Sequence, residues 1–249
     1  MEFVRAREVQ FAVIQLGRKV NWKKVSGILG RTGGNVVLQK DFILPQDCPI
    51  TPIDTEPYSH KLLQTTLTYV LRQLRRPISQ IKIALYDPRG VQIDYALALV
   101  RYCGSLKIVT AKAEMYADFA EHMMEEYGAV VRVVSQFDNP NDNTLIVSPG
   151  QLDAPLDQPI TVPVLSAVEQ TRSLGPYFYH AFRASTPWRY RELMPPEVDE
   201  HAYQAALYQF CGISKLGKTC AAVCTWGDRQ ITINQMVKSL TTLDMPVEV

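Results

Sequence analysis

Three short apolar runs in the middle of the chain alternate with two helical patterns, and this order limits the fold more than any other feature. The runs are Ile81–Tyr86, Leu106–Thr110 and Val130–Val134. Residues 91–103 and 112–127 separate them and carry apolar side chains at helical spacing. Because strand–helix–strand connections of this kind are almost always right-handed, the order predicts a parallel sheet covered on both faces.

Both predicted helices have an apolar stripe, and two further strands are expected after them. These strands are Leu145–Val147 and Ile160–Leu165. Gly104 and Gly128 stand just beyond the two helices, where glycine commonly ends a helix. The side chains predicted to be buried are Ile93, Ala96, Leu97, Val100 and Cys103 in the first helix, and Met115, Phe119, Met123 and Tyr127 in the second.

An N-terminal α/β portion is expected over residues 1–77. Strands are predicted at 9–16 and 36–39, and a short helix capped by Asn21 lies between them. Four prolines within residues 45–57 exclude regular structure there. A long helix is predicted over about 58–76, with a buried stripe of Leu63, Leu67, Val70, Leu71 and Leu74.

Residues 170–249 are expected to form an aromatic and proline-rich segment followed by helices and a hairpin. The ring-rich stretch 177–190 is predicted to be ordered, as extended or broken-helical chain. Asp199 is placed to cap a helix over 200–211, and Thr232 with Gln235 has capping-box spacing for the last helix. Residues 78–169 are then the core, so the chain is predicted to divide into three consecutive portions.

Composition narrows the classes of partner. The 249 residues carry 26 Lys and Arg against 25 Asp and Glu, so no overall field attracts nucleic acid or an anionic membrane. Rings alternate with arginines around residues 182–191, but a packed cover or a protein-partner surface explains them better than nucleic acid. A charged N-terminus, no apolar run of about 20 residues and five scattered cysteines favour a cytoplasmic protein with reduced thiols. A homo-oligomer or a protein partner stays open.

The order of strands and helices over residues 78–165 resembles the Rossmann-like superfamily, in an arrangement similar to shikimate dehydrogenase and glutamyl-tRNA reductase. In those families an additional N-terminal domain precedes the nucleotide-binding domain. The resemblance implies an α/β fold with a central parallel Rossmann-like sheet, an N-terminal α/β portion and a C-terminal helical and hairpin extension. It also implies that a small ligand would bind at the carboxyl ends of the central strands.

The first strand-to-helix turn, Asp87-Pro-Arg-Gly90, departs from the dinucleotide fingerprint G-x-G-x-x-G. Only Gly90 remains, Pro88 lacks a backbone N–H, and Asp87 adds a carboxylate. A carboxylate at a helix N-terminus can occupy the place of a phosphate. Three interpretations stay open: Asp87 caps its own helix and nothing binds, the turn is a divergent nucleotide or other anion site in which Arg89 supplies the cation, or the turn holds a non-nucleotide ligand.

The other strand ends add Thr110, Lys112 and the loop Ser148–Gly150 to the candidate ligand site. The acid that would hold a ribose hydroxyl is missing after the second strand, where Thr110-Ala-Lys112 stands instead. Thr and Lys there could suit a 2′-phosphate, so NADP is favoured over NAD if either binds; the alternative is a solvated lysine. The candidate cofactor-binding residues are Asp87, Arg89, Gly90, Thr110, Lys112, Ser148 and Gly150.

Several other patterns do not support a catalytic or metal site. Gly30–Gly34 follows a helix and precedes a strand, so we interpret it as a helix C-cap and loop. Cys220 and Cys224 on a strand would lie about 13 Å apart, too far to share a metal. Of the four isolated histidines only His180, among aromatic residues, is unusual. The sequence therefore favours a non-catalytic or degenerate Rossmann-like protein; the alternative is a divergent NADP-dependent oxidoreductase.

Overall fold

The computed structural model describes residues 2–6, 9–14, 16–17, 19–30, 36–154, 158–170, 174–212 and 219–243. The chain forms two compact units, each assembled from separate segments. The first unit is Met1–Tyr58 with Ser185–Leu216, and the second is Ser59–Ala184 with Gly217–Val249. The predicted core, 78–169, lies wholly within the second unit.

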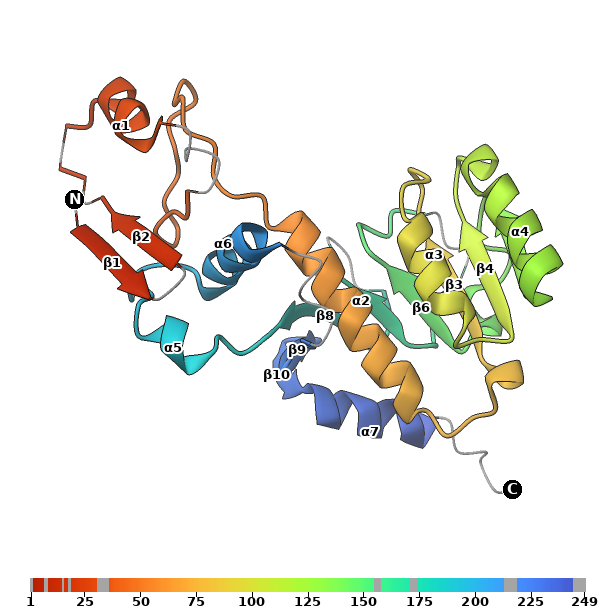
Figure 1. Ribbon diagram of the computed structural model, residues 1–249. Helices are drawn as coiled ribbons and strands as arrows, with labels where there is room; N and C mark the ends of the chain where they lie inside the picture. The colour runs from red at the N-terminus through yellow and green to blue at the C-terminus, as the bar shows by residue number, and fades with distance from the viewer. Residues whose placement is uncertain are drawn as a thin grey trace. The chain divides into compact units, whose positions relative to one another are not determined.

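The second unit is built on an eight-stranded sheet of order β10-β9-β8-β7-β6-β3-β4-β5 (Figure 1). The six neighbouring strands β8, β7, β6, β3, β4 and β5 run parallel to one another. At one edge of the sheet, β9 pairs antiparallel with β8, and β10 pairs antiparallel with β9. In chain order the parallel strands have the Rossmann arrangement 3-2-1-4-5-6, so the sheet is Rossmann-like. The strands are β3 Lys82–Tyr86, β4 Ser105–Val109, β5 Val130–Val134, β6 Leu145–Ser148, β7 Val164–Ser166, β8 Phe178–Arg183, β9 Val223–Trp226 and β10 Arg229–Thr232.

Helices cover one face of this sheet. The α3 helix packs on β3 and β4, α4 packs on β5, and α2 is tied to the start of α3 by a hydrogen bond from Gln64 Nε2 to the Asp94 carbonyl. The Tyr179 hydroxyl of β8 is 3.0 Å from the Ser239 hydroxyl, which brings α7 to the same face. The helices are α2 Glu56–Gln73, α3 Ile93–Val100, α4 Ala117–Tyr127 and α7 Ile233–Leu243, and the single turns η2 Ile78–Gln80 and η3 Ala113–Tyr116 precede β3 and α4.

Loops cover the opposite face. Within residues 135–144, 149–154, 158–163, 167–170 and 174–177, the only helical turn is η4, Pro140–Asp142. The crossovers after β5 move across the sheet in the reverse direction, so right-handed connections must pass over this second face. Side chains from these loops and from alternate strand positions form a shared core, which includes Ala84, Tyr86, Phe137, Ile146, Leu152, Ile160, Val164, Leu174 and Phe178.

The predicted buried stripes of the two helices after β3 and β4 are confirmed in part, since Ala96, Cys103 and Met123 are buried. In α3 the buried residues are Tyr95, Ala96 and Leu99, whereas Ile93 and Leu97 are exposed. The α3 helix begins at Ile93. The carboxylate of Asp87, just after β3, accepts the N–H of its N-cap residue Gln92, and this contact influences which side of α3 faces the sheet. Ahead of α4, residues 113–116 form a 3₁₀ turn with three residues per turn. The four-residue spacing is broken there, so Tyr116 is buried in place of Met115; Tyr127, the last residue of α4, is exposed.

The predicted stripe of α2 is confirmed for Leu63, Leu67, Val70 and Leu71, and Leu74 is half-buried just after the helix. The aromatic stretch expected to be extended or broken-helical contains an inner strand, β8. Its register shifts between His180 and Arg183, and Ala181 has a left-handed φ of 49°. A positive φ at a non-glycine residue marks an irregularity that the surrounding sheet must hold in place.

The first unit contains the antiparallel pair β1 (Glu2–Ala6) and β2 (Val9–Val13), with α1 (Trp22–Leu29), α5 (Trp188–Arg191) and α6 (Glu200–Cys211). The predicted caps are confirmed: Asn21 Oδ1 accepts from the Lys24 N–H, and Asp199 Oδ1 accepts from the Ala202 N–H.

The predicted strand at 36–39 is wrong, because only isolated bridges form, between Val36 and Pro52 and between Gln39 and Val198. The neighbouring segment is proline-rich and offers few N–H donors for a ladder. Gly30 ends α1 with a positive φ, as expected, and residues 31–34 of that loop lie outside the described residues. No helix in the described part of the chain is both long and apolar enough to span a bilayer.

Candidate functional site

The carboxyl ends of the parallel strands carry the residues that the sequence singled out, and Asp87 is the best anchored of them. Its side chain follows β3 and is 3% exposed. One oxygen, Oδ2, accepts hydrogen bonds from the Gln92 N–H at 2.8 Å and from the Tyr116 hydroxyl at 2.7 Å. Gln92 is the N-cap residue of α3, so Asp87 satisfies a backbone donor at the very start of that helix.

Tyr116 covers Asp87 from the η3 turn. The tyrosine is fully buried, and burial followed by the contact with the Asp87 carboxylate raises the pKa of its phenol well above the ordinary value. The phenol therefore remains a hydrogen-bond donor throughout the neutral range. The aromatic stretch 177–190 does not take this position, since residues 178–183 lie within the sheet as β8.

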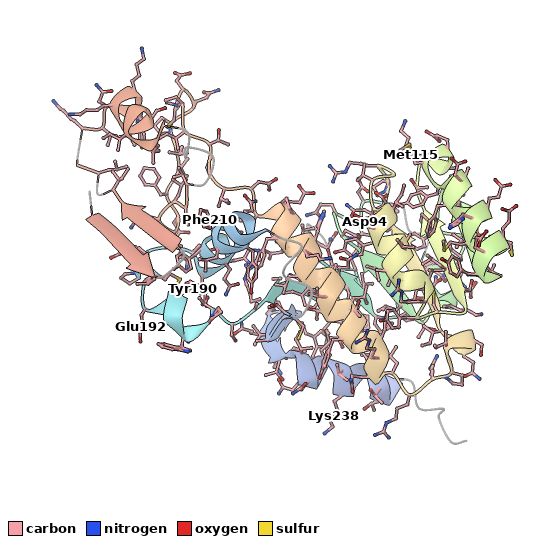
Figure 2. All side chains as sticks on the ribbon, in the orientation of Figure 1. Asp94, Met115, Tyr190, Glu192, Phe210 and Lys238 are labelled. Atoms are coloured by element: carbon pink, nitrogen blue, oxygen red, sulfur yellow. The ribbon has the colours of Figure 1, made fainter. Side chains whose placement is uncertain are left out.

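The rest of the turn is packed against the loop after β4. Gly90 has a φ of 70°, and a Cβ added there would lie 2.8 Å from the Lys112 Cβ and 3.0 Å from the Met115 Cγ. Glycine is thus required both by the backbone conformation and by the close approach of the second loop. Arg89 is exposed. Figure 2 shows Asp94 and Met115 near the starts of α3 and α4, at the edge of the sheet where these loops meet.

Thr110 and Lys112 follow β4, and the structure separates their side chains. Thr110 is 1% exposed, and its hydroxyl oxygen accepts the Lys112 N–H at 3.0 Å in a local turn. The Lys112 side chain is exposed. The Thr110 hydroxyl is thus engaged in the local turn, whereas the Lys112 ammonium group is in contact with solvent.

The loop after β6 is closed by hydrogen bonds to a single carbonyl. The Gly150 oxygen accepts from Ser148 Oγ at 2.9 Å, from Gln170 Nε2 at 3.0 Å and from Ser166 Oγ at 3.4 Å. Gln170 also donates to Ser166 Oγ and accepts the Leu152 N–H. Ser148 and Gly150 thus lie together as predicted, but their polar groups bond to the neighbouring β7 loop.

A polar row on the loop-covered face was missed by sequence reasoning. Register places Ser148 beside Ser166, and alternation along the strands puts Tyr86 and His180 on the same face at the same edge. The Tyr86 hydroxyl donates to Asp153, across the point where strand order reverses between β3 and β6. Tyr86, Ser148 and Ser166 are the last residues of β3, β6 and β7, whereas His180 lies within β8, so the row could be found only from the strand register.

His180 is the one member of this row with an unsatisfied atom. It is 7% exposed and stacks on Phe178 with a ring-centroid distance of 4.6 Å. Its Nδ1 has no hydrogen-bond partner among the described residues. Burial lowers the pKa of the imidazole below 6.5, although Glu169 and a hydrogen bond with the Gly227 backbone act in the opposite direction. The ring is therefore neutral at pH 7.

Two features of this turn concern the place where a dinucleotide pyrophosphate would lie. Such a phosphate needs backbone N–H groups at the start of α3 and room for close approach over the turn. Here the Asp87 carboxylate already accepts from Gln92, and Gly90 is in contact distance of the second loop. Among the described residues no three His, Cys, Asp or Glu side chains are grouped as metal ligands would be.

No protein-family model matches the sequence, and no curated protein matches it. Two of the solved structures that match this chain are, by their names, enzymes of amino-acid metabolism. One is Δ1-pyrroline-2-carboxylate reductase from Thermococcus litoralis in complex with NADH and L-proline, with 10% identity, a TM-score of 0.28, and coverage of 44% of this chain and 36% of that chain. The other is L-tryptophan dehydrogenase from Nostoc punctiforme, with 14% identity, a TM-score of 0.33, and coverage of 89% and 69%. Neither TM-score reaches 0.5, so these similarities indicate nothing about what this chain binds.

Proposed function

We propose that this chain is a degenerate, non-catalytic Rossmann-like protein that acts in regulation or assembly. The observation that carries the proposal is the carboxylate of Asp87, which accepts the Gln92 N–H at the start of α3 and the Tyr116 hydroxyl. A negative charge supplied by the chain stands where a Rossmann protein would hold the phosphate of its cofactor. Adding a phosphate beside it would bring two like charges together in a buried position.

The neighbouring loops support the same proposal. Ser148, Ser166 and Gln170 all donate to the Gly150 carbonyl, so these side chains hold one loop to another. Any ligand at this edge must compete with those bonds or bind above them. Catalytic residues remain unassigned.

A divergent NADP-dependent oxidoreductase is the alternative that experiment must separate from this proposal. It would require Lys112 to reach a 2′-phosphate and the Asp87–Tyr116 contact to open. Thermal unfolding should be followed with NAD, NADP, S-adenosylmethionine and ATP, each at saturating concentration. We expect that none of the four compounds raises the unfolding midpoint, since a compound that binds only the native state would raise it.

The variant Lys112→Ala tests the alternative directly, with Lys82→Ala as its matched control, since Lys82 is an exposed lysine at the amino end of β3. A saturable rise in midpoint with NADP that disappears in Lys112→Ala and persists in Lys82→Ala would overturn the non-catalytic proposal. If none of the compounds shifts the midpoint of a well-folded sample, the oxidoreductase is rejected.

A further inference from the structure

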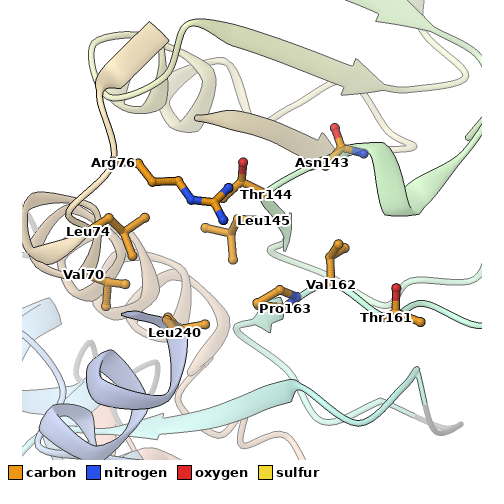
Figure 3. Close-up of a pocket in the computed structure, with 10 residues that line it drawn as sticks. All are labelled: Val70, Leu74, Arg76, Asn143, Thr144, Leu145, Thr161, Val162, Pro163 and Leu240. Atoms are coloured by element: carbon orange, nitrogen blue, oxygen red, sulfur yellow. The ribbon is translucent and has the colours of Figure 1, made fainter. Parts of the chain in front are cut away.

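A small cavity lies at the opposite edge of the sheet from the strand-end loops. It is about 170 Å³ in volume and is bounded by the end of α2, the segments that lead into β6 and β7, and the last turns of α7 (Figure 3). All of these elements belong to the second unit. The proposed loss of nucleotide binding concerns the strand-end loops and not this edge of the sheet. An inference about the cavity therefore does not depend on that proposal.

The walls of the cavity are mostly aliphatic. Leu145 and Leu240 are buried, as is Val70 of α2, and Leu74 and Val162 are half-buried. Their apolar surface favours a hydrocarbon group over a fully hydrated ion. The aliphatic and proline side chains of the lining are Val70, Leu74, Leu145, Val162, Pro163 and Leu240.

One cationic side chain, Arg76, completes this lining, and Figure 3 shows its guanidinium directed toward Thr144. The described residues that line the cavity include no Asp or Glu. Arg76 has a partner within the protein as well, but a guanidinium carries five N–H donors in a planar fork. That fork matches the two oxygens of a carboxylate.

The polar residues on the rim are held by the protein itself. Thr144 exchanges two hydrogen bonds with Lys82: its N–H donates to the Lys82 carbonyl at 2.7 Å, and its hydroxyl accepts the Lys82 N–H at 3.1 Å. Asn143 Nδ2 donates to the Pro140 carbonyl at 2.9 Å. These bonds keep the rim in place before a ligand arrives, which reduces the entropy cost of binding.

The volume sets the size of the occupant. A dry cavity of about 150 Å³ accepts a molecule the size of benzene, which has six heavy atoms. This cavity of about 170 Å³ is open to solvent on one side, so it encloses roughly six heavy atoms of a compound whose charged end lies at the rim. One charge at the rim and aliphatic walls inside require a single anionic group on a short hydrocarbon.

We infer that this cavity binds a small aliphatic monocarboxylate, such as a branched or straight chain of four or five carbons. Its carboxylate pairs with the Arg76 guanidinium, and its hydrocarbon chain lies against Leu74 and Val162, the two half-buried aliphatic side chains of the lining. Each methylene added between acetate and valerate should tighten binding about fourfold, because each buries further apolar surface.

The experiment is a titration of the full chain with isovalerate, followed by amide and methyl NMR. We expect saturable shifts that centre on Leu74 and Val162. Isovaleramide, which has the same shape without the charge, should bind at least about tenfold more weakly, and inorganic phosphate should cause no saturable shift there. This comparison uses the unaltered protein, so it does not depend on any variant folding.

Two neighbouring arginines provide a matched pair of variants. Arg76→Gln should weaken isovalerate binding at least about tenfold, whereas Arg75→Gln, which removes an exposed charge next to it, should change it less than about twofold. Equal binding of isovalerate and isovaleramide, equal losses in the two variants, or the absence of saturable shifts would each overturn the assignment. None of these outcomes bears on whether NADP binds at the other edge.

Discussion

Asp87 lies where the carboxyl end of β3 meets the start of α3, and two donors converge on one of its oxygens. The same position in a dinucleotide-binding turn requires a small residue, so that a phosphate can approach the helix N-terminus. Replacing glycine by aspartate supplies the anion from within the chain. The turn then stabilises its own helix, and a buried tyrosine covers the carboxylate.

Replacing Asp87 by alanine should lower the free energy of unfolding by about 1–3 kcal/mol, because it leaves two buried donors without an acceptor. Asp87→Asn keeps one acceptor oxygen and should cost about 1 kcal/mol or less. Urea denaturation of both variants measures the difference. Tyr116→Phe removes one of the two donors, and a double-mutant cycle with Asp87→Ala should give a coupling free energy of about 0.5–3 kcal/mol. Purely additive effects would show that the contact contributes nothing.

His180 should make stability depend on pH. Burial lowers the pKa of its imidazole in the folded state, so protonation favours the unfolded chain. The stability that the neutral imidazole contributes is fully present above the unfolded-state pKa of about 6.5. It is lost as the pH falls from that value through the lower pKa of the folded state. Thermal midpoints between pH 8 and pH 5 measure this, and His180→Gln should flatten the profile. The exposed His122→Gln is the control; an equal flattening in both variants would contradict the assignment to His180.

Helix ends and helix faces were predicted with different success. The caps at Asn21, Asp199 and Thr232 involve residues within three positions of each other, and all three are present. The buried faces of α3 and α4 were partly mispredicted, because each depends on the residue at which the helix begins. Successive residues lie about 100° apart around a helix, so the point at which the chain enters the helix influences which side chains face the sheet.

The capping box of α7 gives a measurable prediction. The Thr232 hydroxyl accepts the Gln235 N–H at 3.2 Å, and Gln235 Oε1 accepts the Thr232 N–H at 2.8 Å. Thr232→Ala should therefore cost about 0.5–2 kcal/mol of unfolding free energy and increase amide exchange in the first turn of α7. Thr242→Ala is the matched control, because that hydroxyl bonds only to the Lys238 carbonyl within the helix. Equal costs for the two variants would argue against the box.

The two compact units are each held together by different contacts. In the first unit, the Tyr58 hydroxyl donates to Gln204 Oε1, Gln204 donates to Thr186, and Thr186 donates to Glu200. This chain of bonds joins residues from both segments of the unit. The second unit depends instead on the sheet and its two covers.

Tyr58→Phe should loosen the first unit selectively, because it leaves the buried Gln204 oxygen without its donor, at a cost of about 1–3 kcal/mol. Hydrogen exchange measured by mass spectrometry should show lost protection in α6 and in residues 36–53, with β3, β4 and β6 unchanged. Tyr102→Phe, in the second unit, is a control in which an exposed hydroxyl contact with Arg72 is removed. A uniform loss of protection in both units would show that they do not open separately.

How much of the molecule was accessible from sequence depended on the range of the interactions. The strand–helix order of 81–134, the caps and the α2 stripe follow from local spacing, and they sufficed to predict a parallel Rossmann-like sheet. The missing glycines also indicated that the turn at Asp87 is poorly suited to a phosphate. These properties depend on residues a few positions apart, so they can be predicted from the sequence without the tertiary structure.

The remaining features depend on segments that meet only in the folded chain. Tyr116 covers Asp87 from 29 positions away, and the chain of bonds from Tyr58 to Gln204 spans 146. The row of Tyr86, Ser148, Ser166 and His180 exists because the register of β3, β6, β7 and β8 aligns these positions, and the cavity beside Arg76 exists because α2 and α7 end at the opposite edge. Local spacing carries no information about such pairings, since they are set by strand order and by which face each crossover takes.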